Sequence, residues 1–153
     1  MGREGHGFNA SLYRGKKKVA FVMDSADGGM LDIDWLVDCS PKTDATEADW
    51  AKYKAERNEE INLLKTHIAT LPSVELHGQT LTVDIDWFIV ELVETTKINA
   101  KLKRQCKTKT LFRTTSNKIE EHFVIAAKLD EKLRNHLQSK YGKELVEIIN
   151  DRF

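Results

Sequence analysis

The stretch FNASLY, from Phe8 to Tyr13, decides how the fold begins, because apolar and polar residues alternate along it. A period of two predicts a β-strand with one buried face. A turn follows at residues 14–17, and the apolar run from Val19 to Met23 predicts a second strand. A third alternation runs from Met30 to Val37. The three segments predict an antiparallel meander over residues 6–38.

The middle of the chain has the spacing of helices. A helix is predicted over residues 46–71, because Pro72 ends it and either of two N-cap pairs can begin it: Asp44 with Glu47, or Thr46 with Asp49. A second helix is predicted over residues 85–105. Its apolar residues recur at helical spacing after two suitable capping residues, Asp84 and Asp86.

The other segments predict short strands and one further helix. Residues 74–76 and 80–83 predict two short strands between the long helices. Residues 110–115 and 119–126 predict the two strands of a hairpin within residues 109–127. Asp130 caps a helix that ends at Gly142, and an apolar stretch after it favours a last strand. Residues 130–150 are thus predicted to form a helix and a strand.

These elements predict an α+β fold, with an antiparallel β-sheet of about five to seven strands, two long helices and one shorter helix. The length suits a single domain over residues 1–153. The expected core is formed by apolar residues at inward positions: Phe8, Leu12, Val19, Phe21, Ile33, Trp35, Phe88, Leu92, Leu111, Phe123 and Ile125.

The composition is typical of a globular protein. Lys and Arg number 24, Asp and Glu also 24, and 41% of residues are hydrophobic. The two cysteines, Cys39 and Cys106, make neither a disulfide framework nor a zinc knuckle, which indicates reduced thiols. We see no secretory signal, and the apolar runs are far shorter than the roughly 20 residues that span a bilayer. The sequence therefore predicts a soluble, cytoplasmic protein that does not enter a membrane.

The strongest functional signal is a run of cations. Between Lys97 and Lys118 there are eight basic residues and no acidic one, whereas residues 24–49 are rich in acids. Such clusters contact phosphates, and Phe112 would stack on a base if it were exposed. The alternatives are a solvated helix end with Phe112 in the core, and an electropositive patch for an acidic protein surface. The predicted basic patch comprises Lys101, Lys103, Arg104, Lys107, Lys109 and Arg113.

An acidic loop is the second candidate site. Its carboxylates are Asp24, Asp27, Asp32 and Asp34, and carboxylates that converge bind divalent cations. The spacing matches no EF-hand loop, so we favour solvated acids at a hairpin tip. A metal-dependent nuclease is the rival enzymatic hypothesis. Acids near the C-terminus do not have the order of such a site; they are Glu144, Glu147 and Asp151, beside Lys143 and Arg152.

No motif predicts catalysis. The histidines are scattered without the spacing of a zinc site: His6, His67, His77, His122 and His136. Cys106 has cationic neighbours, which lower the pKa of a thiol, but no His or Asp close by in sequence. We find neither a nucleophile elbow nor a phosphate-binding loop. The sequence therefore predicts a protein that is not an enzyme and that uses no cofactor or metal.

Several short motifs resemble those of small uncharacterised phage- and plasmid-encoded accessory proteins. They are GHGFNASLY at residues 5–13, KKVA at 17–20, Asp27-Gly28-Gly29 with Trp35, Leu71-Pro72, residues 84–93, and CKTKTLF at 106–112. The resemblance implies a mobile-element protein of the bacterial cytoplasm that binds a host protein, including targets in bacterial defence. Nucleic-acid binding through residues 97–118 is the alternative, and a metal-dependent nuclease is the second alternative.

One pentapeptide recurs with a single change. Leu31-Asp32-Ile33-Asp34-Trp35 returns as Val83-Asp84-Ile85-Asp86-Trp87. The surroundings predict a strand for the first copy and a helix cap for the second, so the echo does not indicate a structural duplication.

Overall fold

The computed structural model of the chain describes residues 7–76, 78–118 and 121–153. It confirms the α+β class with antiparallel strands, two long helices and one shorter helix. The described residues contain eight strands, which form three small sheets where we expected one. Contacts divide the chain into two compact units, Met1–Val93 and Glu94–Phe153, and the expectation of a single domain stays a prediction.

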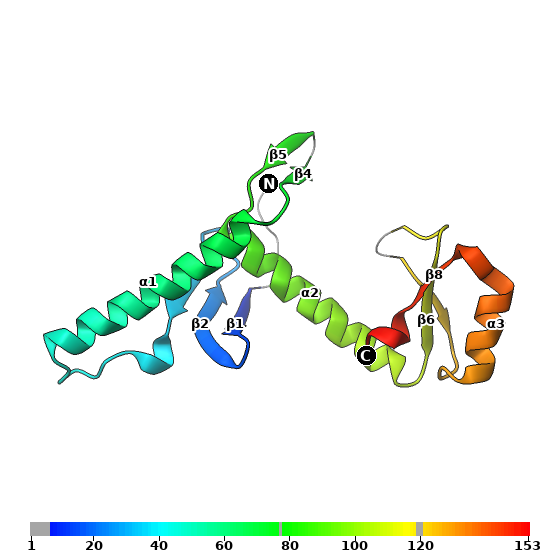
Figure 1. Cartoon of the computed structure of the whole chain (residues 1–153), viewed down its shortest axis with the longest axis horizontal. Coiled ribbons are helices and arrows are strands. Elements are labelled where there is room, and N and C mark those ends of the chain that lie inside the picture. Colours follow the sequence, from blue (N-terminus) through cyan, green and yellow to red (C-terminus); the bar gives the residue numbers. More distant parts are fainter. Residues whose placement is uncertain (1–6, 77, 119–120) are drawn as a thin grey trace. The chain divides into compact units, whose positions relative to one another are not determined.

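The first unit contains the meander, the first long helix and the start of the second. Its elements are β1 (Phe8–Arg14), β2 (Lys17–Asp24), β3 (Asp32–Trp35), the 3-10 helix η1 (Val37–Cys39), α1 (Glu47–Ala69), β4 (Val74–Leu76), β5 (Gln79–Leu81) and the first half of α2 (Ile85–Cys106). Figure 1 shows the β4–β5 hairpin projecting from the junction of α1 and α2, away from β1 and β2.

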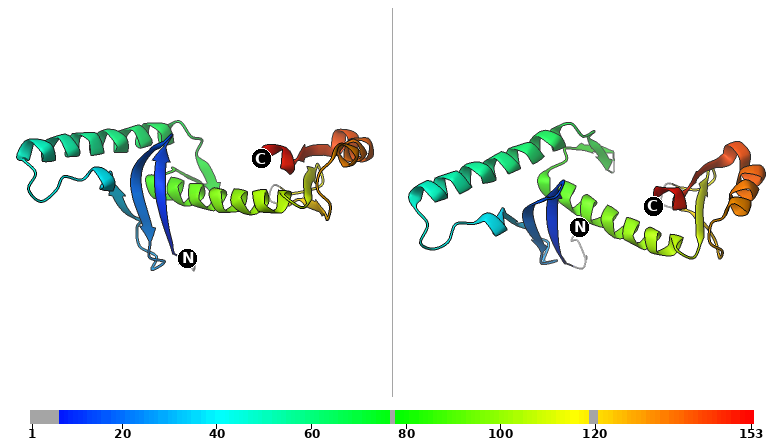
Figure 2. Two further views of the ribbon diagram at one scale, coloured as in Figure 1. Left: turned by 90° about the horizontal axis from the view of Figure 1, so that it is seen from below. Right: turned by 60° about the horizontal axis from the view of Figure 1, so that its bottom comes forward.

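The predicted meander is confirmed, with strand order β1-β2-β3 and every pair antiparallel. Leu12 pairs with Ala20, and Ala20 with Trp35, so that these three side chains share the inward face. Trp35 and Ala20 are buried together with Val22 and with Ile89 of α2. Figure 2 shows β1 and β2 side by side near the two helices. Burial of this face stabilises the unit through the hydrophobic effect.

Capping residues set the starts of both long helices. Thr46 and Asp49 form a reciprocal capping box at the start of α1, which confirms one of the two predicted N-cap pairs. Asp84 begins α2, because its Oδ1 accepts a hydrogen bond from the Trp87 N–H at 2.7 Å. The Tyr53 hydroxyl of α1 donates to the Trp35 carbonyl at 2.8 Å and so joins the helix to the meander.

The second unit contains the end of α2, then β6 (Thr110–Thr114), β7 (Phe123–Ile125), α3 (Glu131–Tyr141), the 3-10 helix η2 (Gly142–Glu144), β8 (Leu145–Ile148) and the 3-10 helix η3 (Ile149–Arg152). β6 is the central strand of the order β7-β6-β8. Leu111 packs against Leu102 of α2 on one face of β6. Phe112 packs against Leu137 of α3 on the other face. Both faces of β6 are therefore covered.

The predicted ends of α3 are confirmed. Asp130 accepts a hydrogen bond from the Leu133 N–H at 2.7 Å and caps the helix. Gly142 follows the helix with a φ of +49°, a conformation that glycine adopts without the strain of a side chain. The last strand, which we favoured over a helix, is also confirmed as β8.

Two predicted core residues lie instead at the surface, because Leu92 is 41% and Phe123 43% exposed. Phe123 belongs to a strand of three residues at a sheet edge, where one side of its ring contacts Phe112 and nothing among the described residues buries it fully. Within the described part of the predicted 119–126 segment, the strand covers only Phe123–Ile125. The Glu121 N–H donates to the Lys118 carbonyl instead of pairing with β6.

Some expectations lie outside the described residues: His6 at the start of the meander, His77 in the turn after β4, and Ile119 and Glu120 in the hairpin. Within the described residues, the helices are all too short or too polar to cross a bilayer.

Candidate functional site

Five of the six predicted patch residues are exposed on the second unit. Three belong to the last turns of α2 and two to the turn that leads into β6: Lys101, Lys103, Arg104, Lys107 and Lys109. We call these five residues the basic surface. In the described part of the chain, none of them has a carboxylate within ion-pair distance. The helix dipole favours cations at this end, which explains why the local sequence tolerates them.

Arg113 differs from the other five. Its side chain is 21% exposed, and its Nη1 lies 3.1 Å from the Glu147 Oε1. Glu147 also accepts hydrogen bonds from Arg152. The Arg152 guanidinium, and then Arg113, lower the pKa of the Glu147 carboxyl despite its partial burial. Arg113 is thus paired within the unit and is not a free cation.

The acids near the C-terminus are neutralised by arginines. Arg134 binds Asp151 through two hydrogen bonds, at 2.7 and 2.6 Å, and lowers the pKa of that carboxyl. Glu147 is held in the same way by Arg152. These two carboxylates, whose order in the sequence did not fit a nuclease site, are therefore engaged in ion pairs within the second unit.

The boundary between the two units is also a boundary in charge. Residues 1–93 contain 10 Lys and Arg against 16 Asp and Glu, and residues 94–153 contain 14 against 8. The formal net charge is therefore −6 for the first unit and +6 for the second. A chain with no net charge thus carries one strongly basic unit, whose field favours anionic partners.

Tertiary structure adds one more lysine to the basic surface. Lys103 and Lys107 line a cavity of about 330 Å³ together with Lys128, which follows β7. Its other lining residues are Cys106, Leu129, Asn150 and Phe153. Phe153 is 47% exposed, so an aromatic ring lies in the same hollow as three ammonium groups. A partner that offers carboxylates around an apolar side chain would fit this combination.

Asn150 fixes the backbone around this cavity. Its Nδ2 donates to the Lys109 carbonyl at 2.8 Å and to the Cys106 carbonyl at 3.2 Å, and its Oδ1 accepts from the Leu111 N–H at 2.8 Å. The amide thereby ties the end of α2 and the start of β6 to η3. Our sequence reasoning missed Asn150, Lys128 and Phe153; the only available signal was a polar amide directly after the apolar run of β8.

Phe112 and Cys106, the two groups that the sequence offered for stacking and for thiol chemistry, do not serve those roles. Phe112 is 3% exposed, which excludes stacking of a base on its ring and places it in the core, the alternative interpretation. Burial raises the pKa of the Cys106 thiol, the opposite of the lowering that its cationic neighbours suggested. A thiol with a raised pKa is a poorer nucleophile at neutral pH, so Cys106 contributes packing against Leu102 and Leu111.

The four aspartates of the acidic loop do not converge. Asp24 accepts from the Ala26 N–H and Asp27 from the Gly29 N–H, so each closes its own turn. The Gly29 hydrogen bond lowers the pKa of the Asp27 carboxyl. Asp32 and Asp34 are exposed on β3. In the ranges that the structure describes, no three His, Cys, Asp or Glu side chains are close enough to hold a metal ion.

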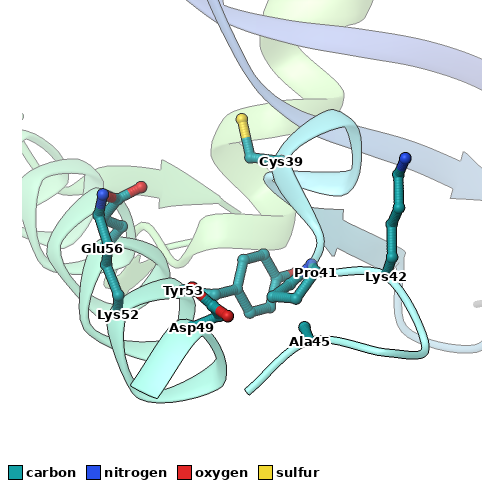
Figure 3. Close-up of a pocket in the computed structure, with 8 residues that line it drawn as sticks. All are labelled: Cys39, Pro41, Lys42, Ala45, Asp49, Lys52, Tyr53 and Glu56. Carbon is teal, nitrogen blue, oxygen red and sulfur yellow. The ribbon is translucent and has the colours of Figure 1, made fainter. Parts of the chain in front are cut away.

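A shallow hollow of about 390 Å³ lies between the loop after η1 and the start of α1. Figure 3 shows Tyr53 of α1 beside Pro41, with the thiol of Cys39 directed away from the Tyr53 ring. Asp49 also lines this hollow, but its carboxylate is used by the capping box with Thr46. The eight lining residues include no imidazole, so the hollow offers Cys39 no paired base.

The first unit also has an apolar groove of about 400 Å³. It lies between the β1–β2 hairpin, α1 and the first half of α2. Apolar side chains form most of its lining, including Leu12, Trp35, Leu64 and Phe88. Arg14 and the buried Glu60 form a polar boundary. Local sequence patterns do not indicate this groove, because its residues come from five separate elements, β1, β2, β3, α1 and α2.

No protein-family model matches this chain, and neither a curated protein nor a solved structure matches it.

Proposed function

We propose that the protein is a non-enzymatic binding module whose basic surface binds an acidic surface of a partner protein. The observation that carries this proposal is that Lys101, Lys103, Arg104, Lys107 and Lys109 are all exposed and lack ion-pair partners in the described chain. Long cationic side chains held together on one unit repel each other, and a carboxylate-rich partner relieves that repulsion. Such complementarity raises the association rate and selects partners by charge.

The immediate surroundings of the cations favour a protein over a nucleic acid. Phe112 is buried and gives no stacking platform. Phe153 and Leu129 instead place apolar surface among three lysines in one cavity. Protein interfaces combine apolar or aromatic anchors with a charged rim, whereas contacts to the backbone of duplex DNA need cations alone.

The proposal extends to the kind of partner. The resemblance to phage- and plasmid-encoded accessory proteins supports a host protein of the bacterial cytoplasm, with inhibition of a defence system as the biological role. Binding of nucleic acid is the second candidate, and the net charge of +6 on the second unit favours it.

Affinity purification from bacteria that express the protein tests the proposal, if the original chain is compared with variants of altered charge. The lysate is treated with nuclease, and co-purifying proteins are identified by mass spectrometry. The site variant carries Lys103→Glu, Arg104→Glu and Lys107→Glu. We expect a partner with an acidic surface to co-purify with the original chain and to be lost with this variant, because three attractive charges become repulsive.

The matched control changes Lys118, Lys132 and Lys143 to Glu. These lysines are exposed in the same unit and form no ion pair within the described residues, so the net charge changes equally while the basic surface stays intact. The control should retain the partner. Retention of the same partner by the site variant contradicts a protein-binding basic surface. So does a partner that co-purifies from untreated lysate and is lost completely after nuclease treatment.

A further inference from the structure

The apolar groove of the first unit has the size and lining of a small-molecule site. Its volume of about 400 Å³ lies within the range of about 300–1,000 Å³ that is usual for ligand pockets. The floor is formed by Val19, Trp35 and Leu64, which are buried or half-buried. Leu63 of α1 stands at the edge with 43% of its side chain exposed. An apolar chain would remove this surface from water.

One boundary of the groove carries two accessible cations. Glu60 is only 5% exposed and accepts hydrogen bonds from Arg14 and from Lys17. Two further carboxylates of α1 act on these cations through charge alone, Glu59 on Arg14 and Glu56 on Lys17. The Arg14 side chain is 57% exposed and the Lys17 side chain 47%, so both remain accessible from solvent.

Hydrogen-bond donors remain on these two cations. Arg14 uses its Nε and one Nη2 hydrogen on Glu60, which leaves three of its five N–H groups. Lys17 uses one of three ammonium hydrogens on the same carboxylate. Since Arg14 itself lines the groove, guanidinium donors lie at the boundary of an apolar space.

We propose that this groove binds a single-chain amphiphile with a carboxylate head. The apolar tail lies along Trp35, Leu64 and Phe88, and the carboxylate accepts hydrogen bonds from Arg14. The remaining Arg14 donors select the occupant. A trimethylammonium head offers them no acceptor, and a neutral head gains no hydrogen bond between two charged groups. The site is in the first unit and does not depend on the function proposed for the basic surface.

Calorimetric titration of the full chain with dodecanoate, below its micelle concentration, tests the inference. Dodecanol and dodecyltrimethylammonium are the comparison ligands, with the same tail and a neutral or cationic head. We expect dodecanoate to bind about tenfold or more tightly than either, as one charge-assisted hydrogen bond implies. Equal affinity for the three ligands, or no binding of dodecanoate, overturns the proposal.

Two variants locate the site. Leu63→Asp places a carboxylate at the edge of the groove and should weaken dodecanoate binding by about tenfold or more, through repulsion and loss of apolar surface. Val37→Asp is the matched control, because Val37 is 42% exposed in the same unit but does not line the groove. It should bind dodecanoate like the original chain. An equal effect of both variants, or no effect of Leu63→Asp, overturns the assignment.

Arg14→Gln tests the head-group contact. Lys17 still compensates Glu60 in this variant, and circular dichroism verifies that the unit is folded. Dodecanoate should lose most of its preference over dodecanol, whereas the affinity for dodecanol stays the same. A preference that survives in a folded Arg14→Gln protein contradicts the assigned role of Arg14.

Discussion

Arg14 holds Glu60 with two parallel hydrogen bonds, from Nε to Oε2 at 2.9 Å and from Nη2 to Oε1 at 2.8 Å. Arg14 ends β1 and Glu60 lies in the middle of α1, so the pair joins the meander to the long helix. Lys17 adds a third hydrogen bond to the same carboxylate. A buried carboxylate is tolerated only with such partners, because its desolvation is costly.

The Glu60 cluster makes the stability of the first unit depend on pH. Arg14, and after it Lys17, lower the pKa of the Glu60 carboxyl from 4.5 to about 2. Because the pKa is lower in the folded state, the stabilisation is present above about pH 4.5 and is lost as the pH falls towards 2. Glu60→Gln should lower the free energy of unfolding by about 1–3 kcal/mol at pH 7. Urea titrations across this range should show the difference shrinking to nothing near pH 2.

Glu59→Gln is the control for this series. Glu59 is the adjacent residue on α1 and is exposed, so its loss should change the free energy of unfolding by less than about 0.5 kcal/mol. If Glu60→Gln were as mild as Glu59→Gln at pH 7, the cluster would contribute nothing to stability.

Asn150 should be the most sensitive polar residue of the second unit. Asn150→Ala removes three hydrogen bonds around the cavity of the basic surface and should cost about 2–3 kcal/mol. Asn150→Asp should cost no less, because a carboxylate cannot donate to the Cys106 and Lys109 carbonyls. Asn135→Ala on the exposed face of α3 is the control and should be nearly neutral. Thermal unfolding measures all three; a neutral Asn150→Ala would exclude the bridging role.

The repeated pentapeptide predicts costs of different size for the same substitution in its two copies. Asp84→Ala removes the N-cap of α2 and should cost about 1 kcal/mol. Asp32→Ala, at the equivalent position of the first copy, removes an exposed side chain on β3 and should change stability by less than about 0.5 kcal/mol. Denaturant unfolding compares the two variants directly, and equal costs would contradict the different roles of the two copies.

A salt titration separates the protein-binding hypothesis from nucleic-acid binding. If the five cations of the basic surface contacted phosphates, affinity for duplex DNA would fall about 10²- to 10³-fold between roughly 50 and 200 mM salt. We expect only weak binding that disappears near 150 mM salt. Gel shifts measure this. Sub-micromolar binding at that salt concentration, abolished by Lys103→Glu, Arg104→Glu and Lys107→Glu, would establish the nucleic-acid alternative instead.

Local patterns in the sequence predicted most of the elements, because strands, caps and turns depend on neighbouring residues. The alternation from Phe8 to Tyr13 gave β1, and the Thr46 and Asp130 caps gave the starts of α1 and α3. The burial of side chains at the edges of the helices and sheets was less predictable. Leu92 and Phe123 have the spacing of core residues, but only distant segments decide whether anything covers them.

The candidate sites divide in the same way. The run of cations after Lys97 could be read from the sequence, and so could its exposure at a helix end. The ion pair between Arg113 and Glu147, which takes Arg113 out of the basic patch, could not be predicted. Nor could the position of Lys128 in the same cavity as Lys103 and Lys107. These pairings join residues more than 20 positions apart, and no local period reports them. The apolar groove and its Glu60 cluster could not be predicted either, because they too join residues that are far apart in the sequence.

The two copies of the pentapeptide show where local information ends. In the first, Asp34 is exposed on β3 and Trp35 is buried beneath α1, because Ala20 of β2 pairs with Trp35 and holds it in a sheet. In the second, Asp84 caps α2, and Asp86 accepts a hydrogen bond from the Leu31 N–H at 3.1 Å. The sequence alone determined the alternation, the caps and the run of cations, since each depends on neighbours along the chain. Only the tertiary structure decided that Trp35 pairs with Ala20 and that Asp86 accepts from the Leu31 N–H, because these partners lie far away along the chain.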